Sequence, residues 1–309
     1  MNRIVLLTLA LGGCLAQRQA EVVPAAVAAA DSLVRQAMAA EQSLDPARVG
    51  TRAVAVAPFQ VSTRDPSLAV LSFGLADLLM TDLARSSQLQ VVDRLRIDAY
   101  LREAGLAATG RVDSATAPRF GRIVGAGRIV LGTLEASRSA ASSLGGRLGD
   151  VVTGAVTPIA SLPPGSLDAI LEAQKALAFA VFDQLGIELT PAERALVEQR
   201  HTKRLAALLA YSRGVRAELR LELQQARADY QEALRLDAGF SAAATRIAEL
   251  NQWGVLPAAR SEITDPLLRV GLLAAEGVIR GGASTSLGAA DPAFRQRQSG
   301  TLIIILNLP

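Results

Sequence analysis

The stretch AVAVAPFQVSTRDPSLAVLSFGLADLLMTDLARS, residues 53–86, determines the fold class of this 309-residue chain. It opens with a short apolar run, 53–59, which contains a proline near its end and is typical of a buried β-strand. A polar segment, 62–67, follows and reads as a loop. Leucines then recur at three- and four-residue steps over 68–86, which predicts a helix with one apolar face.

The same alternation of strands and helices continues along the chain. Further strands are predicted at 89–92 and 128–134, and helices at 97–104, 115–124 and 167–185. The Gly-, Ser- and Thr-rich segment between 135 and 166 is predicted to hold two short antiparallel strands, 138–144 and 150–159. Strands separated by helices indicate an α/β domain over 51–189, a mixed sheet covered by helices.

A small all-α region is predicted to follow at 190–256. Thr190 is a plausible N-cap with Glu193 as its capping-box partner and Pro191 at the first helical position. Helices are expected at 192–200, 206–219, 223–236 and 241–250. Residues 257–309 are expected to form a helix at 265–279, a small-residue loop and a terminal strand, TLIIILNL, at 301–308.

The start of the chain holds its only cysteine, Cys14. A basic residue, an apolar run and the sequence Leu11-Gly12-Gly13-Cys14 match the bacterial lipobox, so 1–13 are predicted to be a lipoprotein signal peptide. Acylated Cys14 would anchor the protein stably in a membrane. Leu15, in place of Asp, favours the outer membrane, facing the periplasm. An ordinary secretory peptide cleaved after Ala16 or Ala20 is the alternative.

The Ala-rich segment 14–50 is expected to be a spacer or a peripheral helix over 25–40.

The composition of the chain argues against two classes of function, nucleic-acid binding and metal binding. The net charge is only +3 and basic residues alternate with acidic ones, which argues against nucleic-acid binding. One cysteine and one histidine cannot form an internal disulfide or supply the usual zinc ligands, so no metal or other cofactor is expected.

The sequence motifs that resemble catalytic or cofactor sites lack the spacing or the neighbours that such sites need. Gly125, Gly127 and Gly132 have the wrong spacing for a dinucleotide fingerprint and stand between a helix and a strand, the reverse of the required order. His201 lies in a polar helix junction among basic residues and is interpreted as a solvated linker residue. We therefore expect no catalytic residues and no enzymatic activity.

Three blocks of sequence resemble the CsgG/HfaB family of curli-secretion-type lipoproteins and its relatives with a TolB-amino-terminal-like or FlgO-like α/β domain. They are the strand and helix within 54–86, QVVDR with the following LREAGL, and FGRIVGAGRIVLGTL. Asp93 stands where the family has Glu, and Gly127 where it has Asp. The resemblance covers about 50–190 and implies a periplasmic domain anchored to the outer membrane. Because four strands long enough to span a membrane are not found, we expect a relative without the channel.

The helical region has a second resemblance, to a tetratricopeptide repeat. Gly214, Ala226, Tyr230 and Ala233 match the small and aromatic packing positions of that repeat, whereas Ala217 and Ala238 depart from it. A plain helical hairpin is the alternative. One and a half repeats cannot stand alone, so this region is expected to pack on the α/β domain or on a neighbouring subunit.

Charged residues and the single tryptophan complete the predicted sites. Family analogy places Asp93, Arg94 and Glu103 near the ends of sheet elements, where an ion pair could orient helices or a subunit contact. The acidic pairs Glu218/Glu222 and Asp229/Glu232 are interpreted as salt-bridged surface. Trp253 is expected to close a helix–helix seam.

These observations predict a non-enzymatic outer-membrane lipoprotein that acts in envelope assembly or secretion through protein–protein contacts. Its partners would be envelope or secretion proteins bound by the helical repeat, the membrane bound by the lipid anchor, and further copies of the chain in a homo-oligomer. The alternative is a periplasmic sensor or binding module for a small ligand or a cell-wall component.

Overall fold

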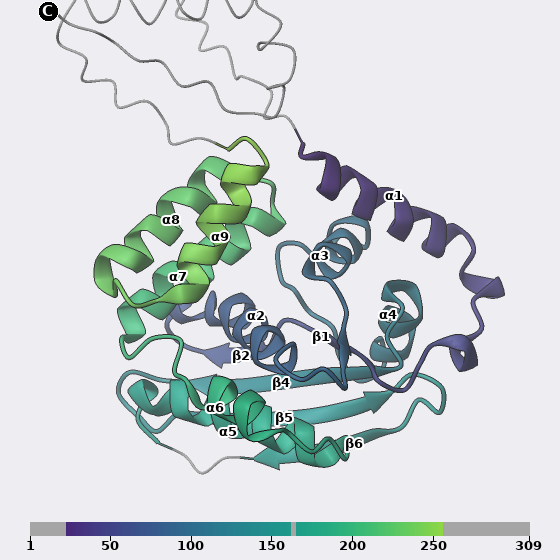
Figure 1. Ribbon diagram of the computed structural model, residues 1–309, viewed down its shortest axis with the longest axis horizontal. Coiled ribbons are helices and arrows are strands. Elements are labelled where there is room, and N and C mark those ends of the chain that lie inside the picture. Colours follow the sequence, from purple (N-terminus) through teal and green to yellow (C-terminus); the bar gives the residue numbers. More distant parts are fainter. Residues whose placement is uncertain (1–22, 162–164, 256–309) are drawn as a thin grey trace, which may run out of the picture. The chain divides into compact units, whose positions relative to one another are not determined.

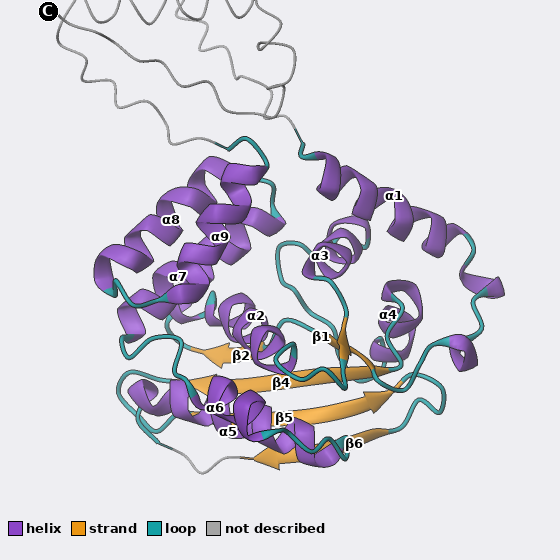
Figure 2. Cartoon of the chain, viewed as in Figure 1, coloured by secondary structure: helices purple, strands orange, loops and turns teal. Residues whose placement is uncertain are grey.

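The computed structural model describes residues 23–161 and 165–255. Figure 1 shows the path of the chain and Figure 2 its secondary structure. The strands are β1 (Ala53–Val56), β2 (Gln60–Thr63), β3 (Gln90–Val91), β4 (Arg128–Ala136), β5 (Ser143–Asp150) and β6 (Val156–Ser161). The α-helices are α1 (Ala25–Ala39), α2 (Leu71–Leu83), α3 (Arg94–Glu103), α4 (Ala117–Val124), α5 (Ile170–Gln184), α6 (Pro191–Glu198), α7 (Leu205–Leu219), α8 (Leu223–Leu236) and α9 (Ser241–Gln252).

The described strands form one mixed sheet in the order β3-β1-β4-β5-β6, with β2 also paired to β4. β1 runs parallel to β3 and β4, whereas β5 is antiparallel to both β4 and β6. The two antiparallel strands expected after β4 are present but begin later than predicted, at Ser143 and Val156. Helices cover this sheet and a helical region follows it, so the predicted fold class is confirmed.

β1 and β2 lie end to end along β4, because both pair with it in parallel. Val56 lies opposite Val130 and Gln60 lies opposite Thr133, so residues 57–59 face only two residues of β4. One extra residue on one strand is the mark of a β-bulge, which bends the strand and interrupts its pairing.

The bulge places Phe59 against the sheet. A Cβ at Gly132 would lie 2.4 Å from the Phe59 ring, so only glycine at this position lets the ring approach the strand. The interpretation of 62–67 as a polar loop was wrong for Ser62 and Thr63, which belong to β2. A short, half-exposed strand has little apolar pattern, and its sequence therefore resembles a loop.

α2 is the central helix of the protein. Every one of its residues except Thr81 is buried, and it packs on β1, β2, α5 and α7. The stretch Pro66–Leu83 is the one described segment long and apolar enough to cross a membrane, but most of it is buried in this core. Two carboxylates, Asp77 and Asp82, are buried with it and therefore need polar partners.

Helices cover both faces of the sheet. A Cβ at Gly121 of α4 would lie 2.8 Å from Ile129 on β4, and a Cβ at Gly146 of β5 would lie 2.4 Å from Leu177 on α5. Gly146 pairs with Gly132, and strand side chains alternate, so Ile129 and Gly146 lie on opposite faces. Since α2 contacts α5 and α3 contacts α4, the helices that follow β2 and β3 lie on opposite sides of the sheet.

α1, expected to be a spacer or a peripheral helix, packs on α3 and α4 (Figure 1). Its residues Val27, Ala30 and Val34 are buried. Salt bridges join it to α3, with 2.6 Å between Arg102 and Asp31 and 2.7 Å between Arg35 and Glu103. α1 is therefore a docked helix of the α/β domain.

The helical region begins at the predicted capping box. Thr190 Oγ1 accepts a hydrogen bond from the Glu193 N–H at 3.2 Å, and the Glu193 carboxylate accepts one from the Thr190 N–H at 2.9 Å. Trp253 ends α9 and packs against the core. The signal peptide 1–13, Cys14, the helix at 265–279 and the strand at 301–308 all lie outside the described residues.

Candidate functional site

The predicted packing residues of the helical region lie together on α7 and α8. Gly214, Ala226, Tyr230 and Ala233 are all buried. A Cβ at Gly214 would lie 2.5 Å from the Tyr230 ring, so the ring fits only because residue 214 is glycine. The Tyr230 ring also packs on Tyr211, with 5.4 Å between centroids. The structure thus places these residues at a helix–helix contact, and their assignment to a tetratricopeptide repeat stays a prediction.

The helical region is joined directly to the α/β domain through α2 and α7. At their crossing a Cβ on Gly74 would lie 1.9 Å from Ser212 Oγ, so the two backbones approach closely. Ser212 Oγ donates to the Leu208 carbonyl at 2.7 Å, which satisfies this buried hydroxyl within its own helix. This close contact surrounds the carboxylate of Asp77 with groups from three further helices.

We name this group of buried charges the Asp77 cluster. It contains Asp77 from α2, Arg94 and Asp98 from α3, Tyr211 and Glu218 from α7, and Arg246 from α9. Asp77 accepts hydrogen bonds from Tyr211 Oη and Arg246 and forms a 3.4 Å salt bridge with Arg94. Arg94 also binds Asp98 at 2.7 Å and pairs with Glu218. The cluster therefore connects four helices through charged hydrogen bonds.

The cluster holds three carboxylates and two guanidinium groups. Burial alone would raise the pKa of Asp77, but Arg246 and Arg94 outweigh burial and hold its pKa below the ordinary value. Burial raises the pKa of Asp98 and of Glu218, and the attraction of Arg94 only partly opposes this. The pKa of Tyr211 is raised well above its ordinary value by burial and by the charge of Asp77. The arginines thus favour the ionised form of Asp77, whereas burial disfavours the ionised forms of Asp98 and Glu218.

The Asp77 cluster lies beside the carboxyl ends of β1 and β3. In open α/β sheets, ligands bind outside the carboxyl ends of neighbouring strands whose following helices lie on opposite faces. β1 and β3 are such a pair, since the α-helices that come next along the chain, α2 and α3, lie on opposite sides of the sheet. Pro58 and Arg94 follow the carboxyl ends of these strands, and Val215 and Glu218 of α7 lie beside them. A cavity of only about 20 Å³ remains there, room for little more than a water molecule. The helical region therefore occupies the usual ligand crevice of this fold.

A second buried group surrounds Asp82 at the other end of α2. Asp82 accepts hydrogen bonds from Gln174 Nε2 at 2.9 Å and Lys175 Nζ at 2.7 Å, both on α5. His201 Nε2 lies 2.9 Å from the same carboxylate. Burial lowers the pKa of Lys175, and Asp82 opposes that shift. The interpretation of His201 as a solvated residue was wrong, because its ring is buried against an acid on α2 and joins the linker before α7 to the core.

The predicted ion pair of Asp93, Arg94 and Glu103 has a different arrangement. Asp93 caps α3 by accepting a hydrogen bond from the Leu95 N–H at 2.8 Å. Glu103 pairs with Arg35 of α1. Of the three residues, only Arg94 enters the buried cluster, with partners that sequence analysis did not identify.

The interpretation of the acidic pairs as exposed surface was also wrong for two residues. Glu218 is 3% exposed and pairs with Arg94, and Asp229 is buried and binds Arg213 Nε at 2.9 Å. Glu232 does form a surface salt bridge, at 2.6 Å with Arg235. Glu218 follows Tyr211 and Gly214 at helical spacing, so the buried face of α7 was the signal that could have identified it.

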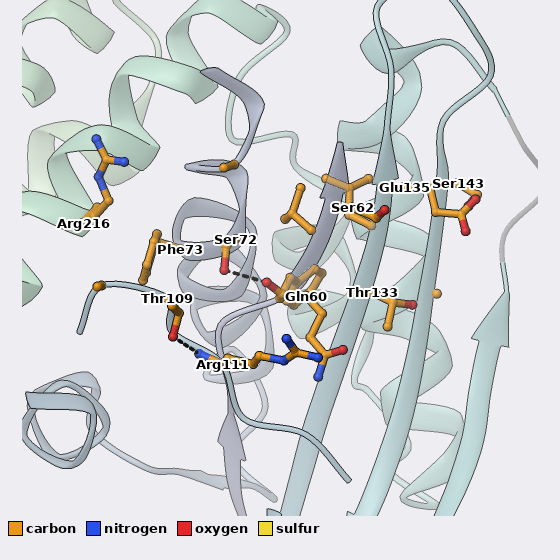
Figure 3. Close-up of a pocket in the computed structure, with 16 residues that line it drawn as sticks. Gln60, Ser62, Ser72, Phe73, Thr109, Arg111, Thr133, Glu135, Ser143 and Arg216 are labelled. Carbon is orange, nitrogen blue, oxygen red and sulfur yellow. Dashed lines mark hydrogen bonds between the residues drawn. The ribbon is translucent and has the colours of Figure 1, made fainter. Parts of the chain in front are cut away.

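A polar groove of about 810 Å³ lies at β2, outside these clusters (Figure 3). Side chains of Gln60, Ser62, Thr133 and Ser143 line it on the sheet, and α2 borders it. Among the described residues no group of three acidic, histidine or cysteine side chains could hold a metal ion. The lipobox residues Leu11, Gly12, Gly13 and Cys14 lie outside the part of the chain that the structure describes.

The protein thus combines an α/β domain with a helical region docked on it. The model of the family described as "Curli production assembly/transport component CsgG" matches residues 35–157, from within α1 to within β6. The match covers less than half of the chain, and over these residues the sequence is similar to that family, in agreement with the resemblance noted above.

Solved structures that match part of the chain include those of two lipoproteins. The C-terminal domain of LpoB from Salmonella enterica is 17% identical, and the match covers 44% of this chain and 94% of that chain with a TM-score of 0.31. Lipoprotein GNA1162 from Neisseria meningitidis is 19% identical, covering 45% of this chain and 99% of that chain, also with a TM-score of 0.31. No curated protein matches the sequence. These distant likenesses carry no functional argument.

Proposed function

We propose that this protein is a non-enzymatic lipoprotein of the bacterial envelope, held in the outer membrane by acylated Cys14 and facing the periplasm. There it acts in assembly or secretion by binding other envelope proteins through its helical region. The observation that carries the proposal is the CsgG family match over 35–157 in a chain whose only cysteine stands in a lipobox.

The described contacts support a role as a binding scaffold. The Asp77 cluster joins α7 and α9 to α2, and the buried group around Asp82 joins His201, in the linker before α7, to the same helix. A partner that binds the helical region would thereby be held in a fixed position relative to the α/β domain. The single histidine serves in one of these contacts, which supports a structural rather than a catalytic role for it.

The anchor is tested by replacing its cysteine. Cys14→Ala should move the protein from the outer-membrane fraction to the soluble periplasmic fraction, because no acyl chain can be attached. Metabolic labelling with a radioactive fatty acid should mark the wild-type protein and not the variant. A variant that stays membrane-bound, or an unlabelled wild type, would contradict the lipoprotein assignment.

The partner surface is tested separately in cells that contain the anchored protein. A photo-crosslinking amino acid at Gln231, exposed on α8, should yield reproducible adducts with envelope proteins. The same amino acid at exposed Ala115, which precedes α4, serves as the control. Equal adducts at both positions, or none at Gln231, would exclude the helical region as the binding surface.

A further inference from the structure

One edge of β2 has no partner strand among the described residues. Phe59 N–H donates to the Ser72 carbonyl at 2.9 Å, and Ser72 Oγ donates to the Phe59 carbonyl at 2.6 Å, so the backbone of Phe59 points away from β4. Successive strand residues alternate, and Val61 and Thr63 therefore point their N–H and C=O groups to the same side. Among the described strands β2 pairs with β4 alone, so no strand lies along its other edge. β2 thus presents an open edge, and Ser72 hydrogen-bonds the residue just before it, Phe59.

Other edges of the described sheet are less suited to accept a strand. β6 contains Pro158, which has no N–H to offer, and proline on an edge strand is a common block to further pairing. β3 consists of two residues only. β2 is therefore the edge in the described sheet that best fits the addition of a strand.

The groove at β2 supplies space beside this edge. Its volume of about 810 Å³ lies within the range typical of ligand sites. It extends from the half-buried sheet residues Thr133 and Ser143 across β2 to Phe73 of α2 and Arg216 of α7 (Figure 3). A chain added at the edge would therefore enter a space already formed by the fold.

The charge in the groove indicates the kind of chain. Arg111 and Arg216 line it, and neither guanidinium has a carboxylate within salt-bridge distance among the described residues. The carboxylate of Glu135 accepts a hydrogen bond from Ser143 Oγ at 3.2 Å. Burial and the charge of Arg220 lower the pKa of Arg216, and the carboxylates of Asp229 and Glu222 oppose this shift only in part.

We propose that β2 binds an extended peptide segment with acidic side chains, which adds to the sheet as a further strand. Its backbone hydrogen-bonds to Val61 and Thr63, and its carboxylates lie near Arg111 and Arg216. Backbone bonds give such strand addition its affinity and side-chain contacts give it specificity. This site is formed mainly by the sheet edge and α2, with Arg216 of α7 as the lining residue from the helical region, and its test does not depend on the membrane anchor or on a native partner.

The test uses the full-length chain purified in detergent and three fluorescein-labelled heptapeptides. The first is Thr-Glu-Val-Glu-Val-Glu-Thr, the second has Lys in place of Glu, and the third is the Glu peptide with alternate backbone amides N-methylated. Fluorescence anisotropy should show binding of the Glu peptide and at least tenfold weaker binding of the other two. Hydrogen exchange should slow at Val61 and Thr63 when the Glu peptide is bound.

Protein variants locate the charges. Arg111→Ala with Arg216→Ala should weaken the Glu peptide by roughly tenfold, since each exposed ion pair contributes up to about fivefold. Arg85→Ala, an exposed arginine just after α2 that does not line the groove, is the matched control and should leave binding unchanged. Circular dichroism confirms that each variant is folded.

Four results would overturn the inference. They are no binding of the Glu peptide at millimolar concentration, equal binding of the Glu and Lys peptides, unchanged binding after N-methylation, and an effect of Arg85→Ala as large as that of the double variant. Tight binding of the N-methylated acidic peptide in particular would show that charge alone acts, which a strand-addition site excludes.

Discussion

Replacing Arg94 by methionine tests whether the Asp77 cluster joins the helical region to the α/β domain. The substitution keeps an unbranched side chain of moderate length but removes the guanidinium that contacts Asp77, Asp98 and Glu218. Asp77 would keep Arg246 and Tyr211 as partners, whereas Asp98 and Glu218 would lose the guanidinium that pairs with them. Removing one member of a buried charge pair typically costs about 3–5 kcal/mol, a large part of the usual stability of a domain. We therefore expect Arg94→Met to lower the free energy of unfolding by about that amount at pH 7.

The loss should depend on pH in a defined direction. The pKa values of Asp98 and Glu218 are already raised by burial, and removal of Arg94 would raise them further. Acids with raised pKa values favour the folded state at low pH and lose that contribution as the pH rises through the folded-state pKa. The cost of Arg94→Met should therefore be smaller at pH 5 than at pH 8.

Urea unfolding followed by circular dichroism measures this cost, with Cys14→Ala in every chain to avoid acylation. Arg35→Met is the control, because it breaks the exposed Arg35–Glu103 pair and should cost no more than about 1 kcal/mol. Arg94→Met with Glu218→Gln should recover part of the loss, because one unpaired acid is removed. A cost for Arg94→Met no larger than that for Arg35→Met would refute the view that the cluster is a coupled buried unit.

Three further outcomes concern other contacts. Gly214→Ala should lower the free energy of unfolding by about 1–3 kcal/mol, because its Cβ would overlap the Tyr230 ring. Gly50→Ala is the control and should be neutral, because a Cβ there would have no atom within 4 Å. Equal Tm values for the two variants would contradict this packing. His201→Ala should cost about 1–3 kcal/mol in urea unfolding, because Asp82 loses a buried partner, and a cost under about 0.5 kcal/mol would restore the solvated interpretation. Backbone N–H groups of Ser87 and Thr190 lower the pKa of Glu193 to about 2, so an NMR titration of its carboxylate should show a midpoint near that value. Since this pKa is lowered, the stabilisation from the capping box is present above the unfolded-state pKa and is lost as the pH falls toward 2; a midpoint near 4 would show that the box is not formed.

The sequence predicted what depends on local pattern. Apolar runs and three- and four-residue periodicity correctly indicated β1, α2 and β4, and Thr190 with Glu193 correctly indicated the start of α6. These features are set by residues within a few positions of one another, so periodicity and capping rules can identify them.

Long-range partners were not predictable in the same way. Glu218 and Arg94 are 124 residues apart in sequence, and nothing local to α7 shows that an arginine of α3 lies beside it. His201 has the same property, with Asp82 119 residues away. Charge in a polar-looking segment was therefore interpreted as surface, although Asp77 and Asp82 inside an otherwise apolar helix indicate buried acids that need partners.

Docking of α1 onto α3 and α4 limits how far the body of the protein can move from its lipid. If Cys14 is acylated, only residues 15–24 separate it from the first residue of α1 at Ala25. Ten residues extend at most about 35 Å, close to the thickness of the bilayer's hydrocarbon layer. The lipoprotein would therefore work close to the inner surface of its membrane, and a partner embedded in that membrane would be within its reach, whereas one at the far side of the periplasm would have to approach it.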